Sequence, residues 1–70
     1  MRKISLAAAR VDAGLKQTEL AKAVGVSVNL IIDWEKGRKV PTKEQLEMYC
    51  EACGCRTSDV NCKVLILADA

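Results

Sequence analysis

Four cysteines in the second half of the chain have a spacing that a metal site could use. They form the array C-x2-C-x-C-x6-C, and four thiolates make a complete ligand set for a structural zinc ion. The cysteines are Cys50, Cys53, Cys55 and Cys62. Three interpretations stay open, namely zinc binding, redox sensing and reduced thiols that fill the core. We favour core thiols, because free cysteine is among the most buried residue types and a reducing cytosol disfavours disulfides.

Basic side chains are concentrated in the first part of the chain. Residues 1–43 hold nine Lys and Arg against four Asp and Glu, a net charge of +5. Residues 44–70 hold two against five, a net charge of −3. One face of so small a protein should therefore attract polyanions, although chance segregation of charge on a solvated surface gives the same pattern. Charge alone does not decide between the two.

The composition argues against several classes of function. The chain has no His, which is the commonest general base and metal ligand, and it has no Gly-rich phosphate loop. We therefore expect no enzyme activity, no small-molecule substrate and no cofactor or metal. One Trp, one Tyr and no Phe leave the chain without the aromatic platforms on which single-stranded nucleic acids stack. Double-stranded DNA remains as a nucleic-acid partner.

The length allows one domain at most, because 70 residues cannot build a second core. The apolar run at 64–67 is far shorter than the roughly 20 residues that span a bilayer. The N-terminus lacks the apolar stretch of a secretory signal. We expect a cytoplasmic protein that makes no membrane contact.

Periodic apolar positions predict four short helices that would hold these side chains in place. The predicted helices cover 6–13, 17–24, 28–36 and 43–53. Three of them follow residues with capping side chains, which are Ser5, Ser27 and Thr42, and Gln45 completes a capping box with Thr42. A glycine follows each helix, at Gly14, Gly25, Gly37 and Gly54. A short final turn is expected at Asp59 and Val60.

The second and third helices have the layout of a helix-turn-helix. The link between them is Gly25-Val26-Ser27, in which Gly25 supplies a turn with positive φ. Ala21 is small enough to let the two helices approach closely, while Val26 and Ile31 fill the space between them.

These residues resemble the Cro/CI (XRE-type) helix-turn-helix family of phage and bacterial repressors. The resemblance is carried by Gly14-Leu15-Lys16-Gln17-Thr18-Glu19-Leu20-Ala21, by Val24-Gly25-Val26-Ser27 with Ile31, by Trp34-Glu35-Lys36-Gly37 and by Pro41. The opening at 4–15 is similar to regulators carried by phages and mobile elements. The resemblance implies an all-α, lambda-repressor-like domain of five short helices over 1–60. The remaining tail, 61–70, is expected to include a short strand at 64–67.

The function that this resemblance implies is sequence-specific binding of double-stranded DNA by a transcriptional regulator, with repression as the expected outcome. The third helix, 28–36, would enter the major groove, and a homodimer would read a palindrome. The apolar run at 64–67 would help self-association or pack on the domain. The alternative is a protein-interaction module, such as an antitoxin or a co-regulator, that retains the fold. Leu30, with Val28 and Ile32, would then contact a protein partner.

The resemblance also assigns roles to individual side chains. Outward positions on the third helix would read bases, and these are Val28, Asn29, Ile32 and Asp33. Asn29 suits an adenine edge, the two aliphatic side chains suit thymine methyl groups, and Asp33 suits a cytosine amino group, which together favour a site of A·T character.

Phosphate contacts are expected from Lys16, Gln17, Lys36, Arg38, Lys39 and Lys43. Arg10 and Glu35 would form a partly buried structural ion pair between the first and third helices. Lys16 departs from the family pattern, which places a small polar N-cap there. Cys50, Cys53 and Cys55 fall where relatives carry small or aliphatic core residues.

Overall fold

The computed structural model describes residues 4–62, and in this range the chain is all-helical, as the sequence predicted. The elements are α1 (Leu6–Asp12), α2 (Gln17–Val24), α3 (Val28–Lys36), α4 (Lys43–Cys53) and the 3-10 turn η1 (Thr57–Asp59). The expected fifth helix is thus only a three-residue 3-10 turn in the part described. The strand expected at 64–67 lies outside the described residues. None of the helices within 4–62 is long and apolar enough to cross a bilayer.

Local capping explains where the helices begin. The hydroxyl of Ser5 accepts a hydrogen bond from the Ala8 amide at 3.1 Å, and the Ser27 hydroxyl accepts one from the Leu30 amide at 3.2 Å. At the start of α4 the Thr42 hydroxyl accepts from the amide of Gln45 at 3.2 Å, while the Gln45 side chain accepts from the amide of Thr42 at 2.9 Å. These bonds satisfy amides that have no partner within the helix.

The start of α2 is capped differently, because Lys16 has no side-chain acceptor to offer. The carboxylate of Glu19 instead accepts a hydrogen bond from the Lys16 amide at 2.8 Å. This is the reciprocal half of a capping box, and it places a negative charge in the first turn, where the helix dipole favours it. The Lys16 ammonium is therefore not used in the cap.

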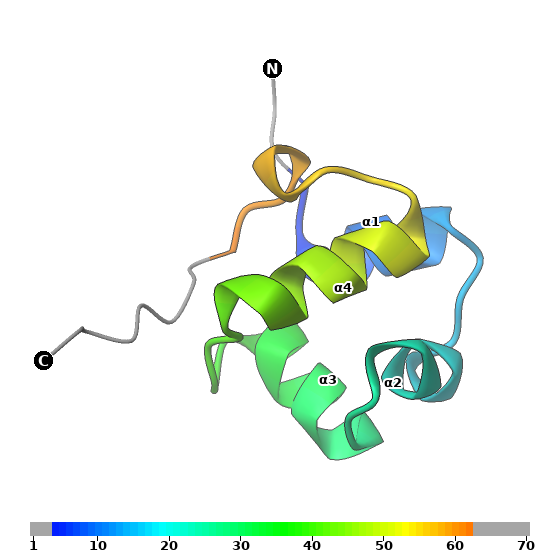
Figure 1. The fold of residues 1–70 in the computed structure, drawn as a ribbon, viewed down its shortest axis with the longest axis vertical. Coiled ribbons are helices and arrows are strands. Elements are labelled where there is room, and N and C mark those ends of the chain that lie inside the picture. The colour runs from blue at the N-terminus through cyan, green and yellow to red at the C-terminus, as the bar shows by residue number, and fades with distance from the viewer. Residues whose placement is uncertain (1–3, 63–70) are drawn as a thin grey trace, which may run out of the picture.

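In Figure 1, α4 lies in front of α1, and α3 and α2 lie below them. Helices α2 and α3 pack against one another, and α4 contacts α1 and α2. The beginning and end of the described chain are joined by a parallel bridge between Ile4 and Val60. The Ile4 amide donates to the Asp59 carbonyl at 2.9 Å, and the Ile4 carbonyl accepts from the Asn61 amide at 2.7 Å. These bonds hold η1 beside the start of α1.

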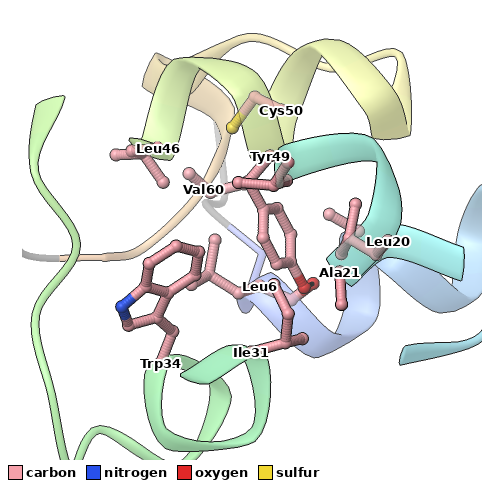
Figure 2. Close-up of a cluster of buried hydrophobic side chains, with 11 residues drawn as sticks. Leu6, Leu20, Ala21, Ile31, Trp34, Leu46, Tyr49, Cys50 and Val60 are labelled. Atoms are coloured by element: carbon pink, nitrogen blue, oxygen red, sulfur yellow. Dashed lines mark hydrogen bonds between the residues drawn. The ribbon is translucent and has the colours of Figure 1, made fainter. Parts of the chain in front are cut away.

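One apolar cluster lies between the helices and draws on all four of them. Its buried members are Leu6, Ala9, Leu20, Ala21, Val24, Ile31, Trp34, Leu46, Tyr49, Cys50 and Val60. The Tyr49 ring projects from α4 into the centre of this cluster, as Figure 2 shows. It meets Trp34 edge to face, with ring centroids 6.5 Å apart. Because α3 contributes Ile31 and Trp34 to the cluster, its inner face is fixed, and the opposite face is left to solvent.

Candidate nucleic-acid interface

The outer face of α3 carries most of the side chains that the sequence assigned to base reading. Asn29 is exposed, and Ile32 and Asp33 are partly exposed. Val28 and Leu30 have the same intermediate exposure as Ile32 and Asp33, but they also pack against the apolar cluster. The apolar strip formed by Val28, Leu30 and Ile32 is therefore less open than the sequence suggested. The side chains left to meet a partner are mainly polar.

The inner face of the same helix ends in a carboxylate that is held from several sides. Arg10 on α1 donates from Nε to Oε2 of Glu35 at 2.7 Å and from Nη2 to Oε1 at 3.2 Å. The two side chains are only 15% and 6% exposed. This bidentate geometry is the strong form of an Arg–carboxylate contact. It joins α1 to the last turn of α3.

Two further donors reach the same carboxylate, and the sequence identified neither contact. Nε2 of Gln17 lies 3.1 Å from Oε1 of Glu35, and the Tyr49 hydroxyl lies 2.8 Å from Oε2. The Tyr49 hydroxyl also lies 2.8 Å from the Leu6 carbonyl, so its single proton serves two acceptors. Side chains from α1, α2 and α4 thus meet at one residue of α3. The sequence did offer a signal for the Tyr49 contact. Tyr49 lies on the otherwise apolar stripe of α4, and a buried hydroxyl needs a hydrogen-bond partner.

The ionisation of this group follows from its surroundings. Burial acts to raise the pKa of Glu35, but hydrogen bonds from Arg10, Tyr49 and Gln17 outweigh burial and leave the pKa below its ordinary value. The hydrogen bond to Glu35 is the main reason that the pKa of Arg10 is raised. Burial and the bond to Glu35 also raise the pKa of Tyr49. The pair is therefore fully charged at neutral pH, and Tyr49 is neutral.

Gln17, at the start of α2, contacts Glu35 across the domain. The sequence assigned it to a DNA phosphate, and the structure places it at the first position of α2 with one amide N–H directed to Glu35. The amide group has a second N–H and a carbonyl oxygen. Lys16 precedes it and is exposed. The two residues occupy the N-terminal end of α2, where the helix dipole favours anions.

Basic residues surround the loop between α3 and α4, and we call this group the basic loop. It comprises Lys36 at the end of α3, Arg38 and Lys39 in the loop, and Lys43 at the start of α4. All four residues are exposed. The helix ends at Gly37, whose φ of 76° is a conformation that glycine adopts without strain. Arg38 Nη1 and Lys39 Nζ lie 3.8 Å and 3.9 Å from the Asp33 carboxylate. The structure thus brings Asp33, expected to read a base, together with two cations expected to bind phosphate.

Cys50, Cys53 and Cys55 lie at or just beyond the C-terminal end of α4, whereas Cys62 lines a pocket together with Gly37 and Lys39 of the loop region. Cys50 is buried, and Cys53, Cys55 and Cys62 are partly buried and pack against the apolar cluster. Burial, helped by a hydrogen bond with Cys55, raises the pKa of Cys50 to about 12. Burial also raises the pKa of Cys53 to about 11. Among the residues described, no three of these groups are placed so that they could hold a metal ion.

Comparison with known proteins agrees with the arrangement of α2 and α3. Residues 6–60 match the helix-turn-helix family. A solved structure of the clp gene regulator ClgR from Corynebacterium glutamicum is similar, with a TM-score of 0.75 and 37% sequence identity. The match covers 77% of this chain and 57% of that one, so the chain spans less than two thirds of ClgR. The search of curated proteins returned no match. The family match covers most of the chain, which therefore belongs to the helix-turn-helix family.

Proposed function

We propose that the chain is a sequence-specific regulator that binds double-stranded DNA through α3. The observation that carries this proposal is the contrast between the two faces of that helix. The inner face is fixed by Ile31, Trp34 and Glu35, while Asn29 is exposed on the outer face and cations follow directly. Membership of the helix-turn-helix family and the likeness to a gene regulator support the same function.

Base reading is proposed for the outer side chains of α3 in a major groove. Asn29 can donate and accept at an adenine edge, and Ile32 can contact a thymine methyl group. Val28 is assigned the same kind of contact with its exposed part only, because it also packs against the core. Asp33 accepts from a cytosine amino group. The expected site has A·T character with a cytosine at one position.

Phosphate contacts are proposed on both sides of this helix. On one side, the contacts come from the basic loop, that is, from Lys36, Arg38, Lys39 and Lys43. On the other side, they come from Lys16 and Gln17 at the start of α2. Such contacts position the protein on the duplex without reading sequence. Arg38→Ala should weaken binding to all duplexes alike and lower the salt slope of the association constant by about one. An unchanged slope would remove Arg38 from the interface.

Repression by a homodimer is the proposed mode of action. Two copies bound about 34 Å apart would read a palindrome on one side of the duplex. Occupation of that operator would deny the promoter to polymerase. Equilibrium sedimentation of the protein with one and two half-sites would measure the stoichiometry, and a single copy on a complete palindrome would contradict the dimer.

Base reading is tested by selecting bound duplexes from a random pool and then titrating the selected duplex. Asn29→Ala should cost about 1–3 kcal/mol on that duplex and relax preference at one base pair. Ser58→Ala is the matched control, because Ser58 is also a neutral polar residue at an exposed position but lies in η1. Equal affinity of wild type and Asn29→Ala for every sequence would contradict the role of α3.

A protein-interaction module is the second candidate function. It is favoured by the absence of Arg or Lys among the four base-reading positions and by three exposed apolar residues, Val11 at 64%, Met48 at 45% and Val40 at 40%. This candidate predicts no affinity for any duplex even at low salt. The DNA-binding proposal predicts dissociation constants of about 10⁻⁴ to 10⁻⁶ M for random duplexes.

A further inference from the structure

Asp33 occupies an unusual place for a residue on a surface that would approach DNA. It is the only acidic residue among the positions assigned to base reading, and a carboxylate repels phosphates at close range. In the structure its side chain is 22% exposed and turns toward the basic loop. It lies within 4 Å of two cations, Arg38 and Lys39, whose own side chains are 65% exposed.

Backbone hydrogen bonds bring Arg38 and Lys39 close to Asp33 independently of the side-chain charges. The Asp33 carbonyl accepts hydrogen bonds from the Arg38 amide at 2.8 Å and from the Lys39 amide at 3.4 Å. These bonds close the last turn of α3 over Gly37 and fold the chain back toward Asp33. The loop would keep this path if the side chain of Asp33 lost its charge. A change from carboxylate to amide therefore alters the electrostatics and little else.

We propose that Asp33 is a specificity-determining residue that holds Arg38 and Lys39 away from DNA until a cognate base pair releases them; the inference rests on the proposed DNA-binding function. In the free protein the carboxylate partly neutralises the two cations. At an unrelated sequence, Arg38 and Lys39 must leave the Asp33 carboxylate to reach phosphates, and the carboxylate gains no new partner in return. At the cognate site a cytosine amino group donates to Asp33, and the two cations turn to the backbone.

The thermodynamic consequence is a penalty that falls mainly on wrong sequences. The ion pairs are long and exposed, so each is weak and is readily exchanged for a phosphate. Even a small penalty matters, because a regulator must discriminate its site against a large excess of other DNA. Specificity of this kind comes from an element that disfavours the competitor, and it adds to the contacts that favour the correct site.

The experiment measures the affinity of wild type and Asp33→Asn for a duplex of random sequence and for the selected duplex, across a range of salt. Asp33→Asn should bind the random duplex at least about threefold more tightly and with a salt slope steeper by about one. The ratio of selected to random affinity should fall by a similar factor. Glu51→Gln is the matched control, since it also removes one negative charge but from the last turn of α4. It should change the random-duplex affinity by less than about twofold.

A double-mutant cycle shows whether Asp33 acts through the two cations. In an Arg38→Gln/Lys39→Gln background, Asp33→Asn should no longer raise random-duplex affinity. If Asp33→Asn still raised random-duplex affinity by the full factor in this background, Asp33 would repel phosphates directly. That result would overturn the proposed exchange of Arg38 and Lys39 between Asp33 and phosphates. A gain no larger than that of Glu51→Gln would overturn the inference while leaving DNA binding intact. Failure of folded wild type and all variants to bind any duplex at low salt would instead overturn the proposed function itself.

Discussion

The two faces of α3 hold their acidic residues very differently. On the inner face, Glu35 receives donors from three other helices within 3.2 Å, and almost none of it is exposed. On the outer face, the only ion pairs of Asp33 given by the described residues are 3.8 and 3.9 Å long, and their cations are mostly exposed. Both are acidic residues two positions apart on one helix. The inner carboxylate therefore fixes the position of the helix, whereas the outer one is held only by long contacts with exposed cations.

The largest effect should come from breaking the inner pair. Arg10→Ala would leave the Glu35 carboxylate buried, with Gln17 and Tyr49 as its remaining donors among the residues that the structure describes. Loss of one partner from a buried pair costs about 3–5 kcal/mol in the free energy of unfolding. Urea unfolding followed by circular dichroism measures this. Arg56→Ala, at an exposed position before η1, should cost less than about 0.5 kcal/mol. A similar loss of unfolding free energy in the two variants would show that the Arg10–Glu35 pair contributes no more to stability than an exposed arginine does.

Neighbouring isoleucines on α3 provide a sharper form of the comparison. Ile31 is fully buried in the apolar cluster, whereas Ile32 is partly exposed and is not a member of it. Ile31→Ala should lower the free energy of unfolding by about 2–5 kcal/mol because it leaves a cavity. Ile32→Ala should cost less than about 1 kcal/mol in stability but weaken binding to the selected duplex. The reverse ranking in stability would contradict the assignment of the faces.

Tyr49→Phe should have an intermediate effect, because it removes one hydroxyl from the inner network. The variant keeps the ring in the core but leaves the Leu6 carbonyl and Oε2 of Glu35 without that donor. The expected loss is about 1–2 kcal/mol in the free energy of unfolding. Thermal and urea unfolding would measure it. A variant as stable as wild type would show that the hydroxyl contributes no net stability.

The smallest expected effect is a dependence of stability on pH. The pKa of Glu35 is lower in the folded chain than its ordinary value of 4.5. A depressed carboxylate pKa contributes stability that is complete above the ordinary value and is lost as the pH falls through the folded value. Wild type should therefore lose more stability than Glu35→Gln as the pH is lowered below about 4.5. Parallel curves for the two proteins would contradict the charged inner pair.

The sequence predicted the helices well because their signals are local. Ser27 and Gly37 bound α3 through contacts within a few residues, and both ends agree with the prediction. The proposed meeting of Arg10 with Glu35 came from a family resemblance rather than from spacing. The contacts of Tyr49 and Gln17 with Glu35 depend on how α4 and α2 pack, which no local pattern encodes.

The outer face was harder to predict for a different reason. Asp33 meets the basic loop only because the chain turns back after Gly37. Val28 packs against the core although its spacing placed it outward, since the first turn of α3 lies close to the cluster. Helical periodicity gives a direction for each side chain, but the path of a loop and the depth of a turn are set by tertiary contacts.

Amide chemical shifts would show whether the outer face of α3 and the basic loop meet DNA. Uniformly ¹⁵N-labelled protein would be titrated with the selected duplex at low salt. We expect the largest shifts at 28–33, at 36–39 and at Lys16 and Gln17, with small changes at Cys50. Shifts gathered around Val11 and Met48, or none at all, would contradict it.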